Sequence, residues 1–210
     1  MTYDALGNRI TLSDPNYGTT TYEYNAFNEL TKSTSPKHDE TACFYDNLGR
    51  AVRQVETDFT TNSATTTEWH YGQEKGQRGL LMGITYPNQT IDYDYDELLR
   101  PSKKTENLFG TDYQTHYYYD NASRIARIVH PSDVEVNYCY TSEGYLRSAM
   151  DAQLNDLWKV NATNTLMQPT QCTTGNDYVT DYSYDPNSNR LTSIHISRSE
   201  ERRVGKECRS

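Results

Sequence analysis

A short motif that opens with tyrosine recurs along the chain, and its spacing is the strongest constraint on the fold. Examples are YDALGNRI from Tyr3, YDNLGRAV from Tyr45 and YDNASRIA from Tyr119. The copies begin at Tyr3, Tyr24, Tyr45, Tyr71, Tyr95, Tyr119, Tyr140 and Tyr184, with a degenerate copy at Asn161. Successive starts lie 21, 21, 26, 24, 24, 21, 21 and 23 residues apart. This regularity predicts a repeat architecture in which each copy is one supersecondary unit.

The pattern within one copy predicts a β-hairpin. Two positions before the motif tyrosine stands a second large or apolar residue, and the two share one face of a strand because side chains alternate. These residues are Tyr22, Cys43, Trp69, Tyr93, Tyr117, Tyr138 and Tyr182. The Asp after the tyrosine can accept backbone amide hydrogens and start a turn. Gly7, Gly49 and Gly144 can supply the positive φ that ends such a turn, after which an apolar alternation resumes.

An arginine commonly follows the turn. Its guanidinium can pair with the turn aspartate or lie on a tyrosine ring, so we expect it to stabilise the hairpin and not to contact a substrate. The predicted structural motif comprises Tyr3, Asp4, Gly7, Arg9, Tyr24, Tyr45, Asp46, Gly49, Arg50, Tyr95, Asp96, Arg100, Tyr119, Asp120, Arg124, Tyr140, Gly144, Tyr184, Asp185 and Arg190.

Composition favours a sheet with a solvent-exposed face. Only 34% of residues are hydrophobic, and the mean hydropathy of -0.93 leans towards disorder. The chain nevertheless contains 19 tyrosines, whose amphipathic rings favour strands and half-buried surfaces. Because a lone hairpin is marginal in water, each must pair with the next. We therefore predict an all-β chain of consecutive antiparallel hairpins that forms a curved sheet.

The ordered series of motifs from residue 1 to about 197 resembles the YD repeats of Rhs proteins, of the B and C components of insecticidal toxin complexes, and of teneurins. Within it, Gly76-Gln-Arg-Gly79-Leu-Leu and the run from Asn137 to Leu146 are similar to the bacterial arrangement. The resemblance implies a section of a hollow β-shell that encloses a toxic C-terminal polypeptide, in a secreted or surface protein. The implied partners are further repeats and a C-terminal toxin or effector domain of the same polypeptide. An alternative is a cell-surface repeat module that binds carbohydrate or protein.

No catalytic residue follows from this resemblance, because the family's self-cleaving aspartates lie in a downstream segment without a counterpart here. We expect no enzyme activity, no cofactor and no metal. Asp92, Asp94 and Asp96 open like a calcium loop, but Glu97 and Lys103 stand where Gly and Glu are required. The formal net charge of -9 disfavours a nucleic-acid partner, and no run of 18 apolar residues could span a membrane. The four cysteines form no CxxC pair, so free thiols are expected.

Both ends of the sequence suggest a window cut from a longer protein. Tyr3 already lies inside a repeat, so Met1 reads as an internal methionine or a mis-assigned start. Residues 198–210, RSEERRVGKECRS, lack tyrosine and resemble the translation of a common sequencing adapter. We therefore expect a repeat array over 1–197 and an artefactual or disordered tail over 198–210.

Overall fold

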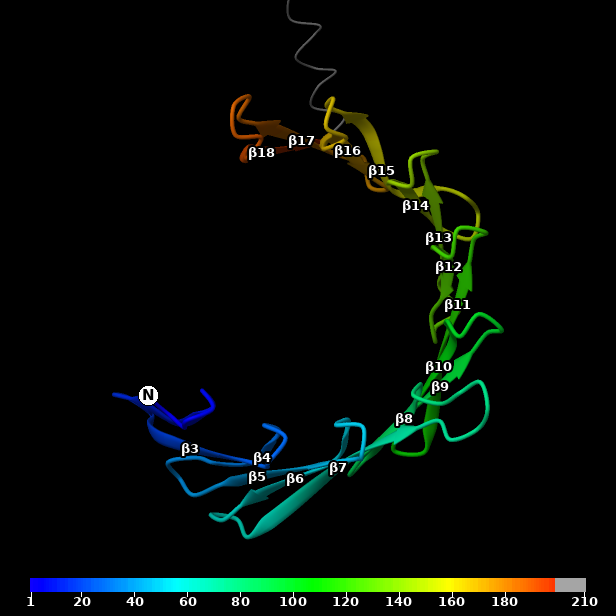
Figure 1. Cartoon of the computed structure of the whole chain (residues 1–210). Coiled ribbons are helices and arrows are strands. Elements are labelled where there is room, and N and C mark those ends of the chain that lie inside the picture. Colours follow the sequence, from blue (N-terminus) through cyan, green and yellow to red (C-terminus); the bar gives the residue numbers. More distant parts are fainter. Residues whose placement is uncertain (199–210) are drawn as a thin grey trace, which may run out of the picture. The chain divides into compact units, whose positions relative to one another are not determined.

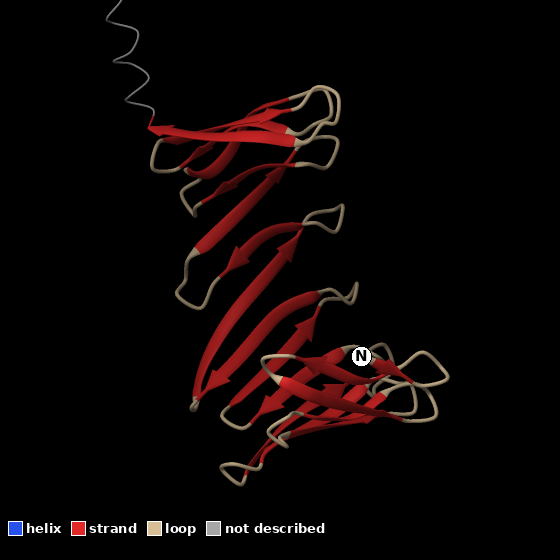
Figure 2. Cartoon of the chain, turned by 90° about the vertical axis from the view of Figure 1, so that its left-hand side faces the viewer, coloured by secondary structure: helices blue, strands red, loops and turns tan. Residues whose placement is uncertain are grey.

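A computed structural model describes residues 1–198 of the chain, and those residues form strands and turns without a helix (Figure 2). The all-β class is therefore confirmed. The strands are β1 (Thr2–Tyr3), β2 (Arg9–Asp14), β3 (Gly18–Tyr24), β4 (Leu30–Thr34), β5 (Glu40–Tyr45), β6 (Ala51–Asp58), β7 (Ser63–Tyr71), β8 (Leu81–Tyr86), β9 (Gln89–Tyr95), β10 (Pro101–Leu108), β11 (Thr111–Tyr119), β12 (Ile125–Val129), β13 (Glu135–Tyr140), β14 (Leu146–Met150), β15 (Asp156–Thr163), β16 (Pro169–Thr174), β17 (Tyr178–Tyr184) and β18 (Leu191–Arg198).

The chain divides into two compact units, residues 1–114 and residues 115–210, with β11 running across the boundary. In the first unit, consecutive strands pair antiparallel, from the pair β1–β2 to the pair β9–β10 (Figure 1). In the second unit the same rule holds from β11 to β18. Each unit is thus a meander of consecutive hairpins, as the repeat predicts.

Neither unit encloses a conventional hydrophobic core. Among the described residues, the buried apolar side chains are Ile91, Cys172 and Val179, and the buried polar one is Ser148. Most strand residues are only half-buried, because each sheet is a single layer. Stability must therefore come from contacts between neighbouring strands, as in repeat proteins whose units contact only their neighbours.

A β-bulge accompanies each hairpin whose turn follows a motif tyrosine. Tyr24 pairs with Leu30 while Glu23 pairs with Lys32, so Thr31 is the extra residue. Tyr45, Tyr71, Tyr119, Tyr140 and Tyr184 sit at the same register shift. The bulge explains why the apolar alternation slips after the turn, since two residues oppose one across the pair.

The motif tyrosines and the residues two positions before them lie on one face of their sheet, which we call the tyrosine face. In the first unit it includes Tyr22, Tyr24, Cys43, Tyr45, Trp69, Tyr71, Tyr93 and Tyr95, and in the second unit Tyr117, Tyr119, Tyr138, Tyr140, Tyr182 and Tyr184. Their side chains are half-buried, whereas intervening residues such as Glu23, His70 and Asp94 are exposed on the other face.

Two boundaries differ from the expectation. The degenerate copy assigned to Asn161 forms its turn at Asn164–Gln168, so Thr163 takes the place of the motif tyrosine. The strand before it, β15, has eight residues where β5 has six, and this extra length displaced the predicted start. At the C-terminal end, Arg198 belongs to β18, while the rest of the predicted tail, 199–210, lies outside the described residues.

Candidate functional site

The turn from Asp46 to Arg50 shows how one motif is built. The amide of Asp46 donates to the carbonyl of Arg50 at 2.9 Å, and the amide of Gly49 donates to the carbonyl of Asp46 at 3.0 Å. The Asp46 carboxylate oxygen Oδ1 accepts from the amides of Leu48 and Arg50 at 2.8 and 3.1 Å. Gly49 has a φ of 75°, a left-handed conformation that costs glycine little. Together these bonds fix the reversal of the chain.

The same five-residue geometry recurs in most copies. Asp4, Asp96 and Asp120 accept the equivalent pair of amide hydrogens, and Asn25 and Asn164 do so with their side-chain oxygens. The fourth residue of each such turn has a positive φ, as at Gly7, Asn28, Leu99, Ser123, Gly144 and Met167. In the Tyr140 copy, Thr141 replaces the aspartate, and its hydroxyl accepts from the amide of Tyr145 at 3.3 Å.

Three turns carry an aspartate–arginine pair. The Nε and Nη2 atoms of Arg50 contact Asp46 Oδ2 at 2.8 and 2.6 Å. Arg100 makes the same pair with Asp96, and Arg124 with Asp120. The bond from the Arg50 side chain is the main cause that lowers the pKa of Asp46, and the corresponding bond lowers that of Asp96. The pKa of Asp120 is lowered first by the amide of Arg124 and then by its side chain.

The turn arginine also contacts the next copy of the motif. The guanidinium carbon of Arg50 lies 4.1 Å from the centre of the Tyr71 ring, and that of Arg124 lies 4.3 Å from the centre of the Tyr140 ring. These are cation–π distances. One side chain therefore closes its own turn and holds the ring of the following hairpin.

The tyrosine hydroxyl completes the link between successive hairpins. Tyr45 donates to the carbonyl of Leu30 at 2.8 Å, and Leu30 is the first residue after the preceding turn. The same bond runs from Tyr24 to Arg9, Tyr71 to Ala51, Tyr95 to Leu81, Tyr140 to Ile125 and Tyr184 to Pro169, at 2.7 to 3.1 Å. Partial burial is the first cause that raises the pKa of Tyr45, Tyr95 and Tyr140. We call this bond the tyrosine lock.

The turn arginines of the first and last copies do not pair with the aspartate, and Arg9 shows the other predicted contact, with a tyrosine ring. Arg9 follows the turn by one residue, so Asn8 bonds to the Asp4 carboxylate instead, and the Arg9 guanidinium lies 4.6 Å from the Tyr22 ring. In the last copy the turn is one residue longer, with the amide of Asp185 donating to the carbonyl of Arg190. There, Asp185 accepts from the amides of Asn187 and Ser188 and from the Ser188 hydroxyl.

Sequence reasoning missed the turns at the opposite ends of the hairpins. Residues 35–39, 130–134 and 151–155 use the same backbone bonds as the motif turns. Asp151 accepts from the amides of Gln153 and Asn155, and the Asn155 side chain bonds back to its carboxylate. The spacing of Asp151 and Asn155 equals that of Asp4 and Asn8, so this signal was present in the sequence.

Two of the aspartates that resemble a calcium loop form ion pairs within the sheet and its turns instead. Asp94 pairs with Lys103 across β9 and β10, whereas Asp96 lies in the turn and pairs with Arg100. No group of three or more His, Cys, Asp or Glu in residues 1–198 is arranged to hold a metal ion. Burial raises the pKa of the Cys43 and Cys172 thiols, which disfavours the thiolate form. Within the described chain, no helix is long and apolar enough to cross a membrane.

Comparison with known proteins places this geometry in a family. Residues 3–40 match the family model described as RHS Repeat. That stretch, which contains the copies at Tyr3 and Tyr24, is similar to an RHS repeat. No curated protein sequence matches it.

Solved structures with the same fold are components of Tc toxins. The chain superposes on TcdB2-TccC3 with a TM-score of 0.77 at 13% identity. It superposes on TcdB2-TccC3 without the hypervariable C-terminal region with a TM-score of 0.78 at 13% identity. A mutant Tc holotoxin pore of Photorhabdus luminescens gives 0.77 at 14%. Each match covers 93% of this chain but only 11% of the other, so the chain spans about a tenth of those proteins. The likeness shows the RHS-repeat fold of the Tc toxin proteins.

Proposed function

We propose that this chain is a section of a structural, non-catalytic shell that encloses a polypeptide, in a secreted or surface protein. The observation that carries the proposal is a single-layer sheet whose tyrosine face has no second layer over it among the described residues. A row of half-buried aromatic rings that no second layer covers offers apolar surface against which another polypeptide can pack. The fold likeness to TcdB2-TccC3 supports the same role, because it covers 93% of the chain.

The construction of the array suits a wall. Tyrosine locks join successive hairpins, and the stacking of Arg50 on Tyr71 and of Arg124 on Tyr140 adds a second link. Such a sheet lengthens by adding repeats and needs no closed core within any one of them. The enclosed partner is a further part of the same polypeptide, held as an incompletely folded chain against half-buried aromatic rings.

Limited proteolysis of the complete gene product tests enclosure. The C-terminal segment that follows the repeats should resist protease in the native protein and be cleaved within minutes after the shell is unfolded. A separately expressed C-terminal segment is the control for its intrinsic sensitivity. Equal cleavage rates for the free segment and for the segment in the native protein would contradict enclosure. Enclosure would also be contradicted if the complete gene encoded a cell-wall anchor after the repeats and no variable C-terminal segment.

A further inference from the structure

One copy of the motif lacks its tyrosine lock. Pro169 follows the turn at Asn164–Gln168 and accepts from Tyr184, just as Leu30 accepts from Tyr45. Leu146 holds the same position after the turn at Thr141–Tyr145, and it pairs with Tyr140 across the same bulge. The residue that should reach back to the Leu146 carbonyl is Thr163, which has neither a ring nor a phenol group.

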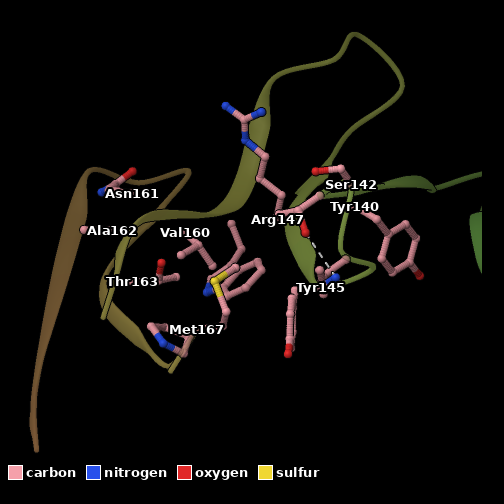
Figure 3. A pocket seen from close by; sticks show the side chains of 13 residues that line it. Tyr140, Ser142, Tyr145, Arg147, Val160, Asn161, Ala162, Thr163 and Met167 are labelled. Carbon is pink, nitrogen blue, oxygen red and sulfur yellow. Dashed lines mark hydrogen bonds between the residues drawn. The ribbon is translucent and has the colours of Figure 1, made fainter. Parts of the chain in front are cut away.

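A hollow of about 590 Å³ lies beside Thr163 and Leu146, the residue that lacks its tyrosine partner. Its lining includes Thr163 itself, Leu146, and the residue Pro169 that pairs with Thr163. Trp158, Val160 and Met167 add apolar surface. The ring of Tyr145 stands opposite Val160 and Met167 (Figure 3). Arg147 extends its guanidinium away from Thr163 and Met167, so the hollow stays open between the two turns (Figure 3).

The rest of the array shows what this position accepts. In six copies a phenol ring lies at the equivalent place, with its hydroxyl 2.7 to 3.1 Å from the equivalent carbonyl. A hollow of about 600 Å³ beside the turns at Asn25 and Asp46 is lined by Tyr45, the residue whose position Thr163 takes in the later copy. The hollow at Thr163 therefore combines an apolar wall for an aromatic ring with a backbone acceptor for a hydroxyl.

We propose that this hollow binds a tyrosine side chain of the polypeptide held against the tyrosine face. The ring of the bound tyrosine lies between Tyr145 and the surface formed by Trp158, Val160 and Met167, and its hydroxyl donates to the Leu146 carbonyl. The source of the tyrosine rests on the proposed enclosure of a polypeptide. The hollow itself does not, because it is formed by residues of this chain alone.

Titration of the full chain with N-acetyl-L-tyrosinamide tests the site. The nuclear magnetic resonance signal of the Trp158 indole N–H should shift and saturate, whereas that of Trp69, outside the hollow, should stay in place. A Trp69→Phe variant assigns the two signals. N-acetyl-L-phenylalaninamide lacks only the hydroxyl and should bind about fivefold more weakly, which corresponds to one ordinary hydrogen bond.

Variants at the missing lock complete the test. Thr163→Tyr should place the chain's own hydroxyl on the Leu146 carbonyl, as Tyr45 does on Leu30, and abolish the shift of Trp158. Thr163→Ser, which adds no bulk, should retain the shift. If Thr163→Tyr does not fold, Val160→Phe narrows the hollow from the other side and should also abolish binding. The proposal is overturned if the unmodified chain gives no saturable shift, if the filled variants still bind, or if the phenylalanine amide binds equally well. Failure of enclosure in the proteolysis experiment would leave these results unchanged.

Discussion

At the scale of single residues, the motif tyrosine does more than contribute apolar surface. Its hydroxyl joins two hairpins through a backbone carbonyl that the bulge leaves accessible, as between Tyr45 and Leu30. The Tyr45–Leu30 bond is part-buried, so a carbonyl that loses this donor is not fully compensated by water. The tyrosine that recurs in the repeat therefore makes a polar contact as well as an apolar one.

Removal of this hydroxyl should destabilise the chain measurably. We expect Tyr45→Phe to lower the free energy of unfolding by about 1 kcal/mol, because the ring stays in place while the Leu30 carbonyl loses its donor. Urea denaturation followed by circular dichroism measures the change. Tyr118→Phe is the matched control, since that ring lies on the opposite face and is 43% exposed. Equal losses in both variants would show that the tyrosine lock adds nothing specific.

The turn aspartates should make stability depend on acidity. Hydrogen bonds from Arg50 and Arg100 lower the pKa of Asp46 and Asp96 in the folded chain below the ordinary 3.8, and those from Arg124 lower that of Asp120. The unfolded chain then takes up protons at higher pH than the folded chain does, so stability falls as the pH drops below 3.8 through the folded values. The melting temperature should therefore decrease in that range.

An asparagine variant isolates this effect. Asp46→Asn, Asp96→Asn and Asp120→Asn together should flatten the acid dependence, since Asn25 shows that an amide can keep the backbone bonds of the turn. The control substitutes the exposed residues Asp92, Asp112 and Asp177 by asparagine, which changes the charge equally. An unchanged acid slope in the turn variant would disprove the assignment.

At the scale of the element, the sequence predicted the hairpins but not the tyrosine hydrogen bonds that join one hairpin to the next. Periodicity two and the turn aspartates located the strands because both depend on side chains that the sequence displays. The partner of each tyrosine hydroxyl is a backbone carbonyl, which leaves no mark in the sequence. Arg9 and Arg190 resembled Arg50, yet a displacement of one residue relative to the turn prevents the pair. The two extra residues of β15 hid the turn at Asn164 in the same way.

The fourth position of the turn offers a test of backbone strain. Leu99 has a φ of 61°, which is unfavourable for a residue with a side-chain Cβ, whereas Leu98 beside it is not among the residues with positive φ. We expect Leu99→Gly to leave stability unchanged or increase it, because relief of strain offsets the added entropy of the unfolded chain. Leu98→Gly, the same substitution one residue earlier, should cost about 0.5–1 kcal/mol. Similar effects of the two variants on the urea midpoint would argue against this account.

At the scale of the whole molecule, stability is a sum of links between neighbouring hairpins. No described residue other than those of β17 pairs with β18, and Leu191, Ile194 and Ile196 on β18 are 48%, 56% and 62% exposed. An unpaired strand with apolar side chains is a template for pairing with another chain. The unpaired strand edge that lets the array lengthen by further repeats therefore also makes β18, the last described strand, prone to pair with another chain.

Self-association through β18 is the consequence for the chain in solution. We expect sedimentation velocity to show oligomers that increase between about 10 and 100 µM, and Ile194→Lys with Ile196→Lys to shift the chain towards monomer, because charge on an edge strand opposes pairing. Leu6→Lys with Leu48→Lys is the matched control. It removes two exposed apolar side chains, 71% and 76% exposed, from turns and leaves the edge of β18 unchanged. A chain that stays monomeric and melts cooperatively at about 100 µM would contradict self-association through β18. A control variant that disperses the oligomers equally well would instead place the contact at the turns.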